Sequence, residues 1–132
     1  MTESANVALV RSIYADWERG DYSRVEWAHR EIGFVRVDGP APGSWTGLAE
    51  MASAWRDVLG AWDEHRSEAV GYRELDDGRV LVLSRNSAQG KTSEAAIATD
   101  AAILFHVRDD RVTRLVLYWD RDRAFADLGL AD

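Results

Sequence analysis

Apolar residues near the start of the chain recur at helical spacing. Residues 5–19 predict a helix, because their main apolar side chains stand three or four positions apart: Val10, Ile13, Tyr14 and Trp17. Ser4 can cap the start of this helix, and Gly20 suits its end. The chain therefore opens with an amphipathic helix that needs a partner for its apolar face.

Further helices and one strand are predicted before residue 65. The segment SRVE, residues 23–26, has capping-box spacing and predicts a short second helix through Ala28. Residues 31–38 form an apolar run that ends in Asp, Gly and Pro, which predicts a strand. Thr46 can then cap a third helix, whose apolar stripe is formed by Leu48, Met51, Trp55, Leu59 and Trp62.

The second half of the chain changes to strand patterns. Tight turns such as Asp76-Asp77-Gly78 separate the apolar runs, and the first two runs predict a hairpin. The predicted strands cover residues 68–75, 79–88, 95–107 and 111–120, and a short terminal helix follows them. Helices followed by a run of antiparallel strands indicate an α+β domain with helices packed on one face of a curved sheet.

Composition narrows the possible partners. The chain has 132 residues, which predicts a single domain over residues 1–132, and a formal net charge of −7, which disfavours a nucleic-acid partner. It has no cysteine, so disulfides, a thiolate nucleophile and a cysteine-ligated metal are excluded. No apolar run reaches the length of a membrane span. We therefore expect a cytoplasmic protein with no membrane partner.

Two segments carry a resemblance to a known family: YADWERGDYS, residues 14–23, and YWDRDRAFADLGL, residues 118–130. With the element order, they make the chain similar to the SnoaL-like branch of the nuclear-transport-factor-2-like superfamily. The resemblance implies a cone-shaped α+β barrel, with N-terminal helices packed in the concave face of a strongly bent, mostly antiparallel sheet around an apolar pocket. It also implies a homodimer formed through the outer face, at alternating residues of 80–88 and 111–119.

Relatives in this superfamily include ketosteroid isomerases, polyketide cyclases and limonene epoxide hydrolases, so the fold alone does not define an activity. Asp38 falls where ketosteroid isomerases keep their general base. An apolar pocket disfavours the ionised form of a carboxyl group and so suits it to proton transfer. The alternative is a turn aspartate that accepts backbone N–H groups in DGPAPG, residues 38–43.

The resemblance departs from the isomerases at their oxyanion hole. Ile13 stands at the position of their tyrosine, with Tyr14 one place later, and Leu104 stands at the position of their second aspartate. Without those donors an enolate would develop unstabilised charge. Ketosteroid isomerisation is therefore not expected of this chain.

Two residues are candidates to act with Asp38. Arg36 shares its face of the strand by alternation. It can anchor an anionic substrate, form a structural salt bridge or, as the resemblance to epoxide hydrolases implies, form an Arg-Asp pair that activates a water. His106 lies on the face of Leu104, and His titrates in the range useful for catalysis. We expect Asp38 and His106 to form an acid–base pair, and the alternative for His106 is a hydrogen-bonded core histidine.

The remaining candidates are taken as pocket residues. Tyr118 can donate a hydrogen bond to a ligand carbonyl. Asp120 shares its face of the strand, or instead caps the terminal helix. Residues that can line the pocket, or simply fill the core, are Tyr14, Trp17, Trp27, Phe34, Trp55 and Leu104. No metal site or cofactor is expected, because the histidines lack ligand spacing and no phosphate loop occurs.

These patterns favour one function and leave two others open. The first is a cofactor-independent acid–base enzyme, of isomerase, cyclase or hydrolase type, acting on an apolar small molecule with a carbonyl or epoxide group. The second is a non-catalytic module that binds a hydrophobic ligand in the same pocket. The third is a structural dimer whose pocket is filled by Trp and Phe side chains.

Overall fold

The computed structural model describes most of the chain. The described residues are 4–19, 21, 25–38, 42–60, 62–76, 78–90 and 96–130. Within them, the described side chains exclude those of residues 57–60, 62–66, 88–90 and 96–98.

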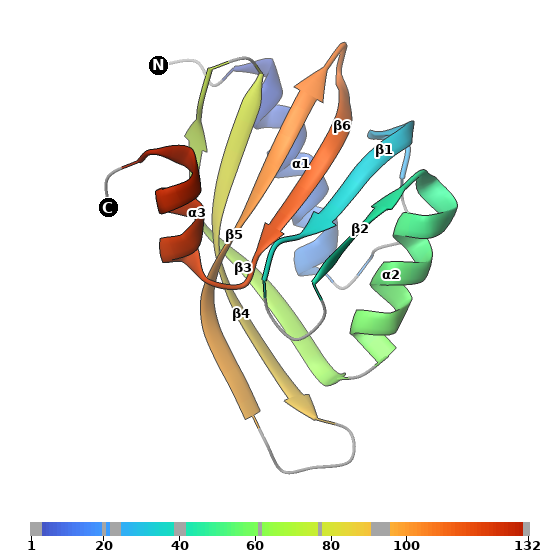
Figure 1. Cartoon of the computed structure of the whole chain (residues 1–132), viewed down its shortest axis with the longest axis vertical. Coiled ribbons are helices and arrows are strands. Elements are labelled where there is room, and N and C mark those ends of the chain that lie inside the picture. The colour runs from blue at the N-terminus through green and yellow to red at the C-terminus, as the bar shows by residue number, and fades with distance from the viewer. Residues whose placement is uncertain are drawn as a thin grey trace.

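Helices and one six-stranded sheet make up the described chain (Figure 1). The helices are α1 (Ala5–Glu18), α2 (Leu48–Gly60) and α3 (Arg121–Leu128). The strands are β1 (Ala28–Arg36), β2 (Gly43–Thr46), β3 (Trp62–Glu74), β4 (Arg79–Gly90), β5 (Ala96–Arg108) and β6 (Arg111–Tyr118). The sheet order is β2-β1-β6-β5-β4-β3; β1 and β6 run parallel, and the other neighbouring pairs are antiparallel. The expected α+β class, with a mostly antiparallel sheet, is confirmed.

The first helix and the strand meander are confirmed. α1 begins after Ser4, whose hydroxyl accepts the Val7 N–H at 3.1 Å, as the capping argument requires. Its expected end at Gly20 lies outside the described residues. Strands β3 to β6 follow one another as antiparallel neighbours.

Three local predictions are wrong. Ala28 begins β1 instead of ending a short helix, because it pairs with Val112 of β6. Residues 43–46 form β2, a strand that the Pro/Gly pattern concealed; Thr46 ends it, and Gly47 precedes α2. Gly47 has φ of 94° and donates its N–H to the Ile32 carbonyl at 2.8 Å, a backbone conformation that suits glycine. Trp62 begins β3 and is not part of the α2 stripe.

The two faces of the sheet carry different apolar clusters. We call inner face the one that bears Phe34, Val82 and Phe105, which pack with α1 and α2. We call outer face the one that bears Leu81, Leu104 and Val116, which pack with α3. Figure 1 shows the sheet curving between these layers, with α1 behind it and α3 in front. Because alternate residues of a strand point to opposite faces, this arrangement assigns each strand residue to one layer.

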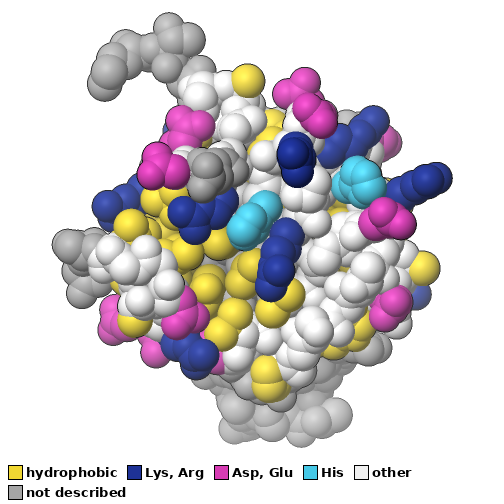
Figure 2. Space-filling view, turned by 45° about the horizontal axis from the view of Figure 1, so that its top comes forward, with side chains coloured by type: hydrophobic (Ala, Val, Ile, Leu, Met, Phe, Trp, Pro, Cys, Tyr) yellow, Lys and Arg dark blue, Asp and Glu magenta, His cyan; other side chains and the backbone are white. Residues whose placement is uncertain are grey.

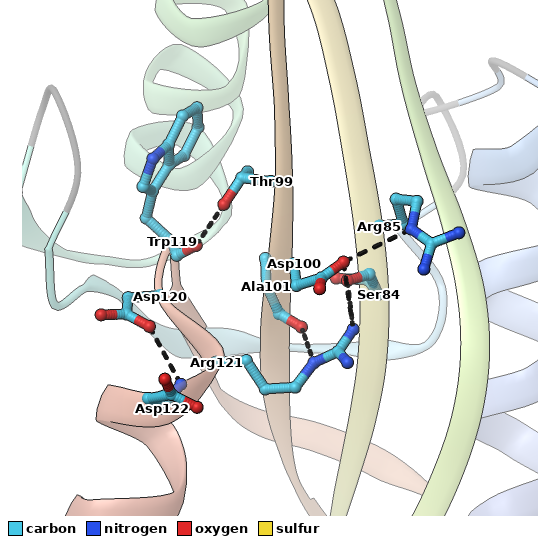
Figure 3. A network of polar contacts seen from close by, with 9 residues as sticks. All are labelled: Ser84, Arg85, Thr99, Asp100, Ala101, Trp119, Asp120, Arg121 and Asp122. Atoms are coloured by element: carbon cyan, nitrogen blue, oxygen red, sulfur yellow. Dashed lines mark hydrogen bonds and ion pairs between the residues drawn. The ribbon is translucent and has the colours of Figure 1, made fainter.

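Arg121 connects the start of α3 to strands β4 and β5 by hydrogen bonds (Figure 3). Its Nε donates to the Ala101 carbonyl at 3.2 Å, and its Nη2 donates to the Ser84 carbonyl at 2.8 Å. Asp120 caps the helix by accepting the Asp122 N–H at 3.0 Å, which confirms the capping alternative for this residue. The helix therefore closes the apolar cluster on this side of the sheet.

Candidate functional site

Aromatic rings form a continuous group on the inner face. The Trp17 ring lies 5.5 Å from Trp55, 5.9 Å from Trp27 and 5.8 Å from Phe105, measured between ring centroids. Phe34 continues the group, with its ring centroid 5.4 Å from Trp55. Four of the residues expected to line a pocket, Trp17, Trp27, Phe34 and Trp55, are thus brought together between α1, α2 and the sheet. Tilted and edge-on contacts of this kind stabilise the group beyond simple area burial.

Arg36 is a half-buried cation at the edge of this aromatic group. Its guanidinium carbon lies 4.7 Å from the Trp45 ring centroid and 5.8 Å from that of Phe34. Its Nη2 donates to the Ala54 carbonyl in α2 at 3.0 Å. Trp45 belongs to β2, the strand that sequence reasoning missed. A guanidinium held over aromatic rings is suited to recognising a planar, negatively polarised group.

Polar side chains continue the inner face along β3, β4 and β5, beyond the aromatic group. Ser84 and Asn86 follow Val80 and Val82 by alternation, and Ser67 and Thr99 pair with Asn86 from the two neighbouring strands. The Thr99 hydroxyl donates to the Trp119 carbonyl at 3.0 Å (Figure 3). These polar residues were not assigned from the sequence. The sequence signal that could have found them is the run 80–86, in which every second residue is first apolar, at Val80 and Val82, and then polar, at Ser84 and Asn86.

Tyr14 joins α1 to this polar part of the inner face. It is fully buried, and its hydroxyl forms a hydrogen bond with the Ser67 hydroxyl of β3. Tyr14 is therefore an inner-face residue, as the lining prediction requires, and its polar end lies near the polar residues of β3 and β4. This contact joins the first helix to the central hairpin across 53 positions of sequence.

Asp38 lies where β1 ends and the chain turns. One carboxylate oxygen accepts the Trp119 N–H at 2.6 Å, and the other accepts the Asp120 N–H at 3.3 Å. Both contacts are to backbone donors between β6 and α3. Asp38 therefore accepts backbone N–H groups, as the turn alternative predicted, but those groups belong to the β6–α3 junction and not to its own loop. They are N–H groups that form no hydrogen bond within the sheet.

His106 is separated from Asp38. It lies on β5 opposite Arg79 and Arg114, whereas Asp38 binds at Trp119, five residues further along the chain than Arg114. At about 3.3 Å per residue, this offset amounts to roughly 16 Å along the strand. The structure therefore does not bring together the expected acid–base pair. Partial burial, Arg114 and Arg79 lower the pKa of His106.

Leu104, His106 and Tyr118 occupy the outer face, which corrects their expected place beside the aromatic group. The inner-face residues of β5 are Ile103, Phe105 and Val107, and Leu104 packs with α3 instead. The sequence correctly predicted that Leu104 and His106 share one face of β5, but the face that packs against α1 and α2 is the opposite one. Burial and Asp127, which also forms a hydrogen bond with it, raise the pKa of Tyr118.

Two further features concern metal binding and membrane insertion. Among the described residues, no group of three or more His, Asp or Glu side chains is arranged to hold a metal ion. None of the helices in the described chain is both long and apolar enough to cross a membrane.

Comparison with solved structures identifies the fold. No family model matches the chain, and no curated protein matches it. A nuclear-transport-factor-2-like protein of unknown function from Burkholderia pseudomallei is similar, with a TM-score of 0.78 and 17% identity over 94% of this chain and 97% of that one. TerC, crystallised with polyporic acid, is similar with a TM-score of 0.75 and 21% identity over 95% and 98% of the two chains.

A third similar structure is a candidate SnoaL-like polyketide cyclase from Shewanella putrefaciens, with a TM-score of 0.73 and 14% identity over 97% and 98% of the two chains. The chain therefore has the SnoaL-like, nuclear-transport-factor-2-like fold, which confirms the resemblance seen in its sequence. Identities at this level establish the fold and leave the activity to the residues of the site.

Proposed function

We propose that this protein binds a small aromatic molecule on the inner face of its sheet, and that Arg36 anchors a carboxylate, phenolate or carbonyl oxygen of that ligand. The observation that carries the proposal is the half-buried guanidinium placed over the Trp45 ring, at the edge of the group formed by Phe34, Trp55 and Trp17. The half-buried rings of Trp45 and Trp55 offer a flat ligand stacking surfaces, and Arg supplies a fork of N–H donors for an acceptor at the end of the ligand. That TerC was crystallised with polyporic acid supports a small organic ligand for this fold.

Acid–base catalysis is the second candidate. Asp38 is a half-buried carboxylate two residues after Arg36, and a positioned carboxylate can act as a general base. Such a step would use Asp38 without His106, because the two lie on different parts of the sheet. Its base would also have to act while it accepts two backbone N–H groups. Binding without turnover therefore has the stronger support.

Arg36→Gln tests the binding proposal directly. The ligands are biphenyl-4-carboxylate and polyporic acid, and binding is followed by tryptophan fluorescence and by the shift in melting temperature. Loss of a charge-assisted contact costs about 1.5–3 kcal/mol, so we expect binding to weaken at least tenfold. The matched control is Arg114→Gln, which removes an exposed arginine from the outer face. Equal affinity of Arg36→Gln and the control, or no binding of either ligand to the wild type, contradicts the proposal.

We also propose that two copies associate through the outer face. Half-buried apolar residues surround the cluster under α3: Val35, Val37, Leu75 and Leu83. The side of the molecule seen in Figure 2 includes a patch of hydrophobic side chains bordered by histidine and basic side chains. Such a patch is a candidate contact surface.

A further inference from the structure

Two buried polar atoms of β4, both on the inner face, have no hydrogen-bond partner within the described chain: Ser84 Oγ and Asn86 Oδ1. Ser84 is fully buried. Both side chains project from β4 on the same face, because they stand two residues apart in a regular strand. Buried polar groups are nearly always paired, so two neighbouring exceptions call for a physical explanation.

The hydroxyls around them are already engaged. Ser67 Oγ is bonded to the Tyr14 hydroxyl, and Thr99 Oγ1 donates to the Trp119 carbonyl. The residues that pair with Ser84 across the sheet are Ala69 and Ala101, which offer no side-chain donor or acceptor. The hydroxyls beside this pair are therefore bonded elsewhere, whereas the pair itself has no hydrogen-bond partner among the described residues.

Sheet register places this pair at the opposite side of the inner face from Arg36. Arg36 pairs with Leu117, Leu117 with Ile103, and Ile103 with Val82, which lies two residues before Ser84. Three strand spacings of about 4.8 Å and two residues of about 3.3 Å separate Arg36 from Ser84 by roughly 16 Å on a flat sheet. This span joins backbone positions, and the guanidinium itself lies over Trp45 of β2, so a ligand that reaches both groups needs at least two linked rings with a polar group at each end.

We propose that Ser84 and Asn86 form a hydrogen-bonding subsite for a hydroxyl group on the end of the aromatic ligand that lies away from Arg36. A hydroxyl group both donates and accepts, so it can donate to Asn86 Oδ1 and accept from Ser84 Oγ. The ligand class is then an aromatic molecule with an acidic or carbonyl group at one end and a phenolic hydroxyl at the other. This inference rests on the proposed function and deepens it.

A matched pair of ligands tests the subsite: 4′-hydroxybiphenyl-4-carboxylate and biphenyl-4-carboxylate, which differ only in the hydroxyl. We expect the wild type to bind the hydroxylated ligand about threefold to tenfold more tightly, as one or two buried hydrogen bonds allow. Ser84→Ala should abolish this preference while affinity for biphenyl-4-carboxylate stays the same. Asn86→Leu should do likewise and serves as the second variant.

The control is Ser87→Ala, which removes an exposed hydroxyl from the same strand. The ligand-free Ser84→Ala protein should melt at the same temperature as the wild type or higher, because an apolar group replaces an unpaired buried hydroxyl. A marked fall in melting temperature would mean that the hydroxyl has a structural partner, which overturns the subsite. Equal binding of both ligands to the wild type overturns the subsite and leaves the proposed function standing. If neither ligand binds, the proposed function fails, and the subsite fails with it.

Discussion

Replacing Asp38 should destabilise the protein, because its carboxylate holds the junction between β6 and α3. The Trp119 N–H lies 2.6 Å from one carboxylate oxygen and is partly buried. The Asp120 N–H lies 3.3 Å from the other and is exposed. A hydrogen bond to a charged group contributes about 1.5–3 kcal/mol where water is excluded. We expect the partly buried contact to Trp119 to contribute an energy within that range, and the long, exposed contact to Asp120 to add little. Asp38→Ala should therefore lower the free energy of unfolding by about 2 kcal/mol.

This free energy converts into a measurable change in melting temperature. An unfolding entropy of about 2.1 cal/mol/K per residue gives roughly 280 cal/mol/K for a chain of 132 residues. A loss of about 2 kcal/mol then lowers the melting temperature by about 7 °C. Asp38→Asn keeps one acceptor oxygen but loses the charge, and should cost about half as much.

Urea denaturation followed by tryptophan fluorescence measures the effect as a lower midpoint with an unchanged slope. Glu31→Gln is the matched control, because it also removes one negative charge from an exposed carboxylate of β1. If Asp38→Ala and Asp38→Asn unfold at the wild-type urea concentration, the carboxylate does not hold the junction. Asp38 would then be free to act as a catalytic base.

Two further predictions concern the outer face. Partial burial, Arg114 and Arg79 lower the pKa of His106 below 6.5 in the folded protein, while the unfolded chain keeps the ordinary value. Below about pH 6.5 the unfolded chain therefore binds more protons than the folded protein. The free energy of unfolding decreases as the pH is lowered, until His106 of the folded protein also becomes protonated. His106→Gln should remove this contribution below about pH 6.5, measured by urea denaturation at several pH values. Parallel pH dependences for the wild type and His106→Gln would refute the sign of the shift. If two copies associate through the outer face, sedimentation at micromolar concentration should show a dimer, and Leu83→Glu should convert it to monomer; a monomeric wild type contradicts the association.

Local sequence signals predicted the elements that depend on local physics. The α1 helix follows from its apolar spacing and from Ser4, whose hydroxyl caps it in the structure. Turns around Gly78 and Asp109 separate strands whose alternation is unambiguous, so the meander from β3 to β6 could be predicted. The cap at Asp120 was one of two alternatives, and its own backbone contact confirms it.

Other features depended on contacts between distant segments. β2 is four residues long and exists because it pairs with β1, which in turn pairs in parallel with β6; neither partner is visible in the local pattern of residues 43–46. Ala28 belongs to a strand for the same reason. At Ala28 tertiary pairing overrode the predicted helix, because ladder hydrogen bonds with a distant strand outweigh weak helix propensity; residues 23 and 24 of the capping segment lie outside the described residues.

The candidate site shows the same division. Sequence alone determined that β4, β5 and β6 each present two alternating sets of side chains, since the strand period is 2. Which set meets α1 and α2 was decided only when the chain folded, and that choice placed Leu104 and Tyr118 under α3 and His106 on the same outer face, opposite Arg79 and Arg114. It also placed Ser84 and Asn86 on the same face of the sheet as the aromatic group. The physical reason is that strand alternation is a property of each backbone, whereas the identity of the covered face depends on where distant helices bury their own apolar stripes.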